Sequence, residues 1–201
     1  MDDILPEIRD TVDLRRFSGR WFEVARSRGI PFEPDGITDV HALYSWDGRT
    51  FGIRNEALLN DRPIYWETHV KRIVNAYNSR FVIEVPLPPG ARTVAGPREG
   101  IYRILMLDMR NYEWAVVASG ERDNWIWVLS RERLMTQTRW ETIYSVLENH
   151  FGVDLRTLEY TTHTRKDGDK VVHADYGAAV APRQLVEALG DGEYNVDIGK
   201  R

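Results

Sequence analysis

The chain has 201 residues, of which 42% are hydrophobic and 29% are charged, and its net charge is −4. This balance is typical of a soluble globular domain and excludes a disordered or collagen-like chain. No apolar run approaches the roughly 20 residues that a membrane helix needs. Nucleic-acid binders usually carry a basic excess or stripe, and because none is visible we expect no nucleic-acid partner.

Cysteine is absent from the sequence. Disulfides, thiolate metal sites and cysteine nucleophiles are therefore excluded. The first ten residues, MDDILPEIRD, are acidic and lack the apolar segment of a signal peptide. We therefore expect a cytoplasmic protein.

Short strands separated by turn signals are predicted along the first two thirds of the chain. The dipeptide Asp47-Gly48 between two alternating runs is the strongest of these turn signals. Residues 86–97 are too rich in proline and glycine to be a strand and are predicted to form a loop. The predicted strands are 20–28, 38–46, 51–57, 64–74, 81–85, 102–108, 114–119 and 125–130. Strands this short and this closely spaced predict an up-and-down barrel or a sandwich.

The hydrophobic period then changes to that of a helix over residues 136–150. Thr138 and Glu141 fit a capping box, and Gly152 is suited to end the helix. Its apolar stripe must dock on the outside of the sheet. A short strand is predicted over 155–161, then a polar loop over 162–170 and a candidate helix over 182–189.

Three segments in order carry a family resemblance. VDLRRFSGRWFEVAR (12–26) contains Gly19-x-Trp21, LDMRNYEWAVVASG (107–120) spans a turn between two strands, and NWIWVLSRER (124–133) contains Arg131. Their order and spacing, with the helix that follows, resemble the lipocalin family, and within it the group of bacterial lipocalin, apolipoprotein D and plant temperature-induced lipocalin. The resemblance covers about residues 10–162.

The resemblance implies an all-β fold: an eight-stranded antiparallel up-and-down lipocalin barrel with one C-terminal α-helix packed outside. It makes residues 1–162 the ligand-binding barrel domain and 163–201 a C-terminal extension, which we interpret as a lid over the barrel or a partly disordered tail. Gly19, Trp21 and Arg131 are expected to close the barrel without touching ligand. The Arg131 guanidinium is expected to stack on the Trp21 indole.

Side-chain alternation along strands predicts the barrel lining. With Arg131 inward, Trp125 and Trp127 share its face, and charged Arg54 and Glu56 favour Asn55 inside. Lipocalins place the aromatic residue of an A-x-Y pattern, here Tyr44, in the pocket. The candidate ligand-binding residues are Val40, Ala42, Tyr44, Ile53, Asn55, His69, Lys71, Trp125 and Trp127.

The strand at 64–74 leaves two alternatives open. Aligned on the family pattern, it turns Glu67, His69 and Lys71 inward, where they would anchor a ligand headgroup. The alternative is a one-residue bulge that returns these charges to solvent and turns Trp66 and Val70 inward. Buried charges without partners are costly, so the two alternatives predict different pockets.

No catalytic, metal or cofactor motif is present: the five histidines lack metal-ligand spacing. We expect binding and transport, storage or scavenging of a fatty acid, lysophospholipid, sterol or isoprenoid. The alternatives are a lipocalin-type isomerase or hydrolase using Glu67 with His69 or Tyr44, and an interaction module acting through 163–201. Ile30 and Phe32, in the loop 29–37, are candidates for contact with ligand or with a membrane surface. We expect a monomer or a weak dimer.

Overall fold

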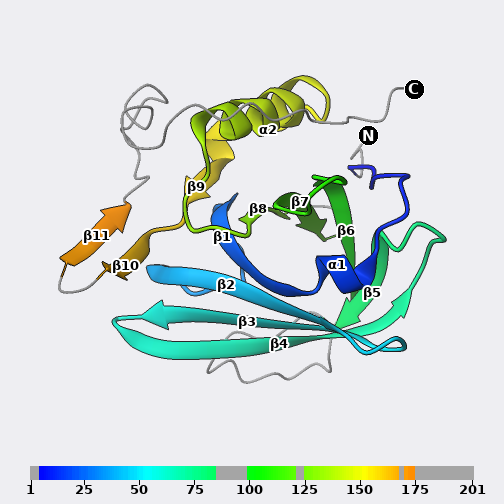
Figure 1. Ribbon diagram of the computed structural model, residues 1–201, viewed down its shortest axis with the longest axis horizontal. Coiled ribbons are helices and arrows are strands. Elements are labelled where there is room, and N and C mark those ends of the chain that lie inside the picture. The colour runs from blue at the N-terminus through cyan, green and yellow to red at the C-terminus, as the bar shows by residue number, and fades with distance from the viewer. Residues whose placement is uncertain (1–4, 85–98, 121–124, 168–169, 175–201) are drawn as a thin grey trace.

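The computed structural model describes residues 5–84, 99–120, 125–167 and 170–174. The predicted loop 86–97 and the predicted helix 182–189 lie outside these residues. The suggestion that the tail covers the barrel also concerns a part of the chain that is mostly outside them. The strands and helices named below are those of the described ranges (Figure 1).

An antiparallel barrel forms the body of the molecule. Its strands are β1 (Gly19–Ser27), β2 (Ile37–Trp46), β3 (Phe51–Leu59), β4 (Arg62–Ile73), β5 (Arg80–Glu84), β6 (Glu99–Leu107), β7 (Trp114–Ser119) and β8 (Trp125–Ser130). Each pairs with its neighbour in sequence, and β1 pairs with both β8 and β2, which closes the sheet. The predicted eight-stranded up-and-down barrel is therefore confirmed.

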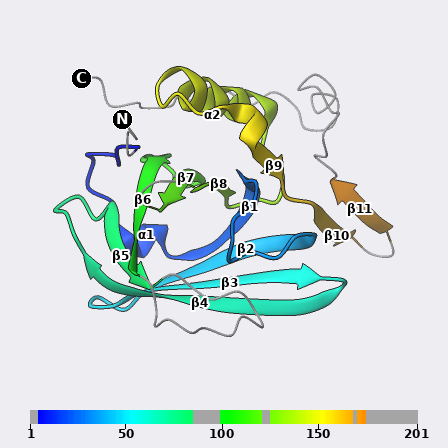
Figure 2. The same ribbon diagram turned by 180° about the vertical axis from the view of Figure 1, so that it is seen from behind.

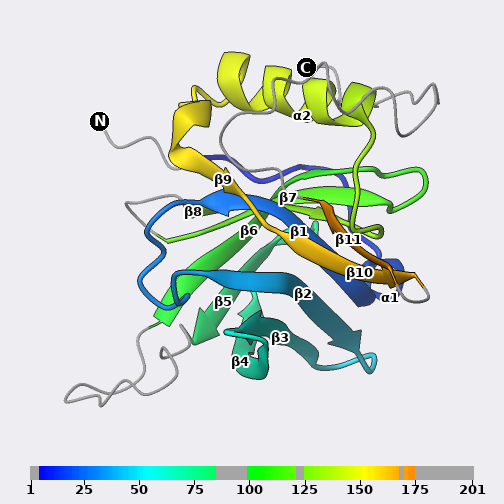
Figure 3. The ribbon, with the colours of Figure 1, turned by 90° about the vertical axis from the view of Figure 1, so that its left-hand side faces the viewer.

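One long helix, α2 (Gln137–Asn149), lies over the outer face of β7, β8 and β1 (Figure 3). Trp140, Ile143 and Leu147 are buried against outward side chains of the sheet, as the helical period predicted. The predicted capping box is wrong, because the N-cap is Thr136 and Glu141 accepts a hydrogen bond from Gln137 Nε2 instead. None of the helices within the described ranges is long and apolar enough to cross a membrane.

The strand predicted at 155–161 is shorter than expected. A 3-10 turn, η1 (Leu155–Thr157), comes first because the Asp154 side chain accepts a hydrogen bond from the Arg156 backbone N–H. Strand β9 (Leu158–Tyr160) follows and pairs with the end of β1, outside the barrel.

A two-stranded hairpin replaces the polar loop predicted at 162–170. Strand β10 (His163–Asp167) pairs with β11 (Lys170–Ala174) and stands to one side of the barrel (Figure 2). The prediction overlooked a second Asp-Gly hairpin signal at 167–168. The start of β10 is fixed to the barrel, since the Thr164 N–H donates to Asp39 Oδ1 and His163 Nε2 lies 2.6 Å from the Glu23 carbonyl oxygen.

A single helical turn, α1 (Leu14–Phe17), precedes β1 and lies across one end of the barrel. Asp13 caps it by accepting hydrogen bonds from the backbone N–H groups of Arg15 and Arg16. The turn carries Phe17 into the barrel, where its side chain is fully buried. This end is called the closed end below, and the opposite end, which carries the loop between β1 and β2, is called the mouth.

Candidate functional site

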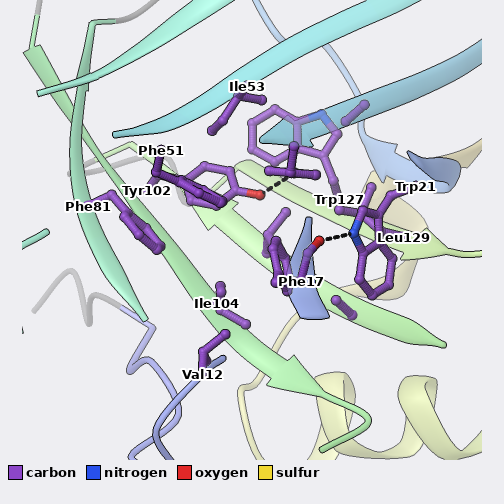
Figure 4. Close-up of a cluster of buried hydrophobic side chains, with 14 of the residues drawn as sticks. Val12, Phe17, Trp21, Phe51, Ile53, Phe81, Tyr102, Ile104, Trp127 and Leu129 are labelled. Atoms are coloured by element: carbon purple, nitrogen blue, oxygen red, sulfur yellow. Dashed lines mark hydrogen bonds between the residues drawn. The ribbon is translucent and has the colours of Figure 1, made fainter. Parts of the chain in front are cut away.

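The closed end is held by an indole and a guanidinium. Trp21 is 0% exposed, and its Nε1 donates to the Phe17 carbonyl at 2.7 Å (Figure 4). The Arg131 guanidinium lies 3.9 Å from the centre of the Trp21 ring and donates to the carbonyls of Arg16, Ser18 and Arg20. Gly19 has φ +101°, and a Cβ there would lie 3.2 Å from Arg131 Nη1, so glycine suits both the backbone and the space.

Aromatic rings fill the barrel next to this plug. Tyr44 contacts Phe17 and Phe51 with ring centres 5.0 Å and 5.7 Å away, and Phe51 stacks on Phe81 at 5.1 Å. The Tyr44 and Tyr102 hydroxyls are 2.6 Å apart. Burial raises the pKa of Tyr44, so its phenol stays protonated. The closed half of the barrel is therefore packed with aromatic side chains.

A cavity occupies the mouth half. Its volume is about 50 Å³, several times the roughly 10–15 Å³ that one buried water needs. Apolar and aromatic side chains form most of the wall, and short polar side chains interrupt it. The lining residues are Glu23, Phe32, Glu33, Val40, Ala42, Tyr44, Ile53, Asn55, Trp66, Thr68, Ile83, Tyr102, Val117, Ser119, Trp127 and Leu129.

Most predicted lining residues lie in this wall, but three do not. Those that line the cavity are Val40, Ala42, Tyr44, Ile53, Asn55 and Trp127. Trp125 is half-buried and packs edge-on against Phe32 rather than lining the cavity. His69 and Lys71 were wrong as cavity residues, because both side chains are exposed.

The register of β4 explains the error. Trp66 pairs with Asn55 and Thr68 pairs with Ile53, which turns Trp66 and Thr68 inward and Glu67, His69 and Lys71 outward. Lys71 Nζ lies 3.0 Å from Glu84 and 3.2 Å from Glu99 outside the barrel. The second alternative therefore had the correct orientation, but the bulge lies further along, between Val70 and Arg72 where β4 meets β5.

The acid–base pair considered for an enzyme is not assembled, since Glu67 and His69 face solvent while Tyr44 faces the cavity. Among the described residues, no group of three or more His, Asp and Glu side chains could hold a metal ion. Ile30 and Phe32 are 4% and 8% exposed, so neither is available to enter a membrane, although Phe32 lines the cavity.

A buried charged cluster beside the cavity escaped the sequence analysis. Arg26 Nη1 lies 3.5 Å from Glu23 Oε1 and 3.3 Å from Glu33 Oε2, and Arg26 Nε donates to Glu159 Oε1 at 2.8 Å. Trp127 Nε1 donates to Glu33 Oε1 at 3.0 Å. Glu23 and Arg26 are 3% and 8% exposed, and Glu159 lies nearer the surface.

A bulge in β1 brings this cluster together. Glu23 pairs with Leu129 and Arg26 with Trp127, while Val24 and Ala25 between them both face the helix side. In a regular strand, residues three apart point to opposite faces. No signal in the sequence predicts the extra residue, and none predicts that Glu33 turns inward from its loop.

Electrostatics in the cluster favour protonated carboxyls. Burial raises the pKa of Glu33 to about 8, and repulsion from Glu23 adds to this rise while Arg26 opposes it. Burial also raises the pKa of Glu23 against the attraction of Arg26. Three carboxyls share one guanidinium, so the cluster cannot neutralise itself with all its carboxyls ionised.

A second hollow, of about 610 Å³, lies beside β10. It is open, and charged side chains such as Asp39, Arg54 and Arg133 contribute to its lining. Apolar ligands need concave walls that bury most of their surface. The cavity in the barrel, whose wall is mostly apolar, is therefore the better site for such a ligand.

A closed barrel with an apolar cavity at one end defines a class of small-molecule binding folds. The family model described as Lipocalin-like domain matches residues 12–163. The chain therefore belongs to the lipocalin family, as its motifs suggested. Lipocalins generally bind small hydrophobic ligands.

Relatives and solved structures agree with this assignment. Outer membrane lipoprotein Blc of Escherichia coli (strain K12) is 31% identical over 120 residues, which cover 59% of this chain and 62% of that protein. The chain thus matches about three fifths of the length of this relative. Temperature-induced lipocalin-1 of Arabidopsis thaliana is 27% identical over 160 residues, covering 77% of this chain and 81% of that one. Insecticyanin from the tobacco hornworm Manduca sexta has a TM-score of 0.58 at 17% identity, covering 79% and 84% of the two chains, which supports the fold alone.

Proposed function

We propose that the protein binds one small hydrophobic molecule in the mouth cavity and transports, stores or scavenges it without chemical change. The observation that carries the proposal is the cavity itself, whose wall joins Ala42, Ile53 and Trp127 with the amide of Asn55. Burial of apolar ligand surface, at about 25 cal/mol per Å², supplies the affinity. Asn55 orients a polar end of the ligand.

The size of the cavity selects among the expected ligand classes. Its 50 Å³ is well below the roughly 300–1,000 Å³ of pockets that hold drug-sized ligands. A single alkyl chain, such as that of a fatty acid, or a slim isoprenoid enters with the smallest rearrangement. A sterol or a lysophospholipid requires Phe32 and Trp127 to move aside.

Native mass spectrometry of freshly purified protein tests the proposal. We expect a co-purifying species of lipid mass, or stoichiometric uptake of an added medium-chain alcohol. Filling the cavity with Ala42→Phe is expected to abolish this uptake. Ser45→Phe is the matched control, because Ser45 lies on the opposite, exposed face of β2 and a ring there leaves the cavity open.

Two results would contradict the proposal. One is wild-type protein that takes up none of these ligands. The other is uptake that Ala42→Phe and Ser45→Phe leave equally intact. A product of altered mass after incubation would instead favour the enzyme alternative, for which the outward Glu67 and His69 offer no support.

Location and assembly are also proposals. The matching bacterial relatives are named outer membrane lipoproteins, so they do not support the cytoplasmic location expected from composition. We therefore propose peripheral association with a membrane surface, tested by flotation with liposomes; protein that never floats would count against it. We propose a monomer or weak dimer, with barrel domain 1–162 and extension 163–201, to be checked by analytical ultracentrifugation and limited proteolysis.

A further inference from the structure

Two acidic side chains, and no basic ones, belong to the described wall of the cavity. Among the described residues that line the cavity, the charged ones are Glu23 and Glu33. Arg26, which pairs with both, also bonds to Glu159, so one guanidinium is shared by three carboxyls. A wall of this kind disfavours a carboxylate or phosphate and favours a cation.

The two carboxyls differ in how their oxygens are bonded: both oxygens of Glu33 accept hydrogen bonds, from Trp127 Nε1 and from Arg26 Nη1. Glu23 Oε1 accepts a hydrogen bond from Thr161 Oγ1, while its Oε2 accepts none from the described residues. Glu33 is held in place by Trp127 Nε1, whose indole also lines the cavity. An ammonium group between these side chains would meet two carboxyl groups.

On this basis we propose that the mouth cavity selects ligands that carry a protonated amine, with Glu23 and Glu33 binding the ammonium group and the apolar wall burying the remainder. This inference rests on the proposed function and names the class of ligand for the same cavity. It departs from the fatty acids expected at first, whose carboxylate would be repelled by either carboxyl once that carboxyl is ionised.

Proton exchange gives the proposal a distinctive pH dependence. Burial raises the pKa of Glu33 to about 8, so its carboxyl is largely protonated at neutral pH. A bound ammonium replaces that proton, and amine affinity should therefore rise with pH until Glu33 is ionised in the free protein. The groups facing Glu33 are Glu23 and Arg26 from β1, Glu159 from β9 and the Trp127 indole from β8. Tyr44 and Tyr102 also line the cavity and stay neutral because burial raises both pKa values.

Three probes with the same alkyl chain separate charge from hydrophobicity: n-octylamine, 1-octanol and octanoate. Isothermal titration calorimetry measures their binding to the full chain between about pH 6.5 and pH 8.5, a range in which the amine stays protonated. We expect n-octylamine to bind roughly tenfold more tightly than 1-octanol at the upper pH, and octanoate to bind most weakly. Amine affinity should rise roughly tenfold across the range, and octanoate affinity should fall.

Isosteric variants identify the residues. Glu33→Gln keeps the acceptor for Trp127 Nε1 and removes the charge, so it should lower n-octylamine affinity about tenfold and abolish the rise with pH. Glu23→Gln, a second variant, should act in the same direction. Glu67→Gln is the control, because Glu67 is exposed on the outer face of β4 and should leave all three probes unchanged.

The outcomes separate failure of this inference from failure of the proposed function on which it rests. If 1-octanol binds and n-octylamine binds no more tightly, the inference fails and the proposed function stands. The same holds if both Gln variants still prefer n-octylamine to 1-octanol. If octanoate binds most tightly, the inference also fails. If none of the three probes binds, the proposed function fails together with the inference.

Discussion

The two ends of the barrel are built from the same strands and are rich in the same aromatic residues, yet they differ in how their polar groups are satisfied. At the closed end, the Arg131 guanidinium donates to backbone carbonyls and the Trp21 N–H bonds to Phe17. At the mouth, the Trp127 N–H bonds to Glu33, and three carboxyls share Arg26. The donors of Trp21 and Arg131 at the closed end have backbone acceptors, whereas the carboxyls at the mouth outnumber their one guanidinium partner beside a cavity.

This difference suggests that the closed end contributes mainly to stability and the mouth mainly to binding. Close packing at the closed end is costly to disturb. Imperfectly paired buried charge at the other end costs stability and is typical of functional sites. We therefore expect substitutions at the two ends to move different measurements, and the following predictions test that separation.

The largest effect is expected from Trp21→Ala. It removes a fully buried indole and its hydrogen bond to Phe17, and should lower the free energy of unfolding by about 3–5 kcal/mol. Trp66→Ala at the mouth should cost less, because Trp66 already faces a cavity. Urea denaturation measures both; an equal or larger loss for Trp66→Ala would remove the distinction between the two ends.

A loss of about 2 kcal/mol is expected from Arg131→Lys, because an ammonium group cannot replace the planar donor fork or its stacking on Trp21. The matched control is Arg54→Lys. Arg54 lies 4.4 Å over the ring of exposed Tyr65, where the contact should be worth less than about 1 kcal/mol. Thermal denaturation compares the two variants. Equal shifts in melting temperature would show that the contact of Arg131 with Trp21 is no stronger than the exposed contact of Arg54 with Tyr65.

A change in how stability depends on pH is expected from Glu33→Gln. The Glu33 carboxyl ionises near pH 4.5 in the unfolded chain and at about 8 in the folded protein. Between these values the folded state holds more protons, so its free energy of unfolding falls as pH rises, and the loss is complete above about pH 8. The variant lacks this group and should show a flatter profile in urea unfolding from about pH 5 to pH 9. If the free energy of unfolding of Glu33→Gln falls with pH as steeply as that of wild type and of Glu67→Gln, then Glu33 ionises normally in the folded protein.

The smallest effect is expected from His69→Leu combined with Lys71→Leu. Both side chains are exposed, and the ion pairs of Lys71 lie outside the barrel, where such pairs contribute about 0–1 kcal/mol. Ligand affinity should stay within about twofold of wild type. Asn55→Leu, in the cavity wall, is the comparison and should change affinity for ligands with a polar end. Selective loss of anionic-lipid binding in the double variant of His69 and Lys71 would show that these residues belong to the binding site.

The barrel could be predicted from the sequence because side-chain alternation and turn signals are local and recur from strand to strand. Strand alternation placed Ala42, Asn55 and Trp127 correctly. Asn55 lies between charged Arg54 and Glu56, which must face water, and Trp127 shares the parity of Arg131. Parity failed at His69 and Lys71 because the family alignment shifted β4 by one residue, and a shift of one exchanges the two faces.

The charged part of the site was missed for a different reason. Glu23 and Arg26 share one side only because β1 is irregular between them, and Glu33 reaches them from a loop. Neither feature leaves a periodic signal in the amino-acid sequence. Contacts between residues distant in the chain, such as Arg26 with Glu159, depend on the closed fold itself.

A crystal structure of the protein grown with 1-octanol tests the central claim most directly. We expect ligand density inside the mouth half of the barrel, in contact with Ala42, Asn55 and Trp127, and a closed end unchanged around Trp21. Density confined to the outer hollow beside β10, or a mouth filled by Trp127 and Phe32 with no ligand at saturating concentration, would contradict it.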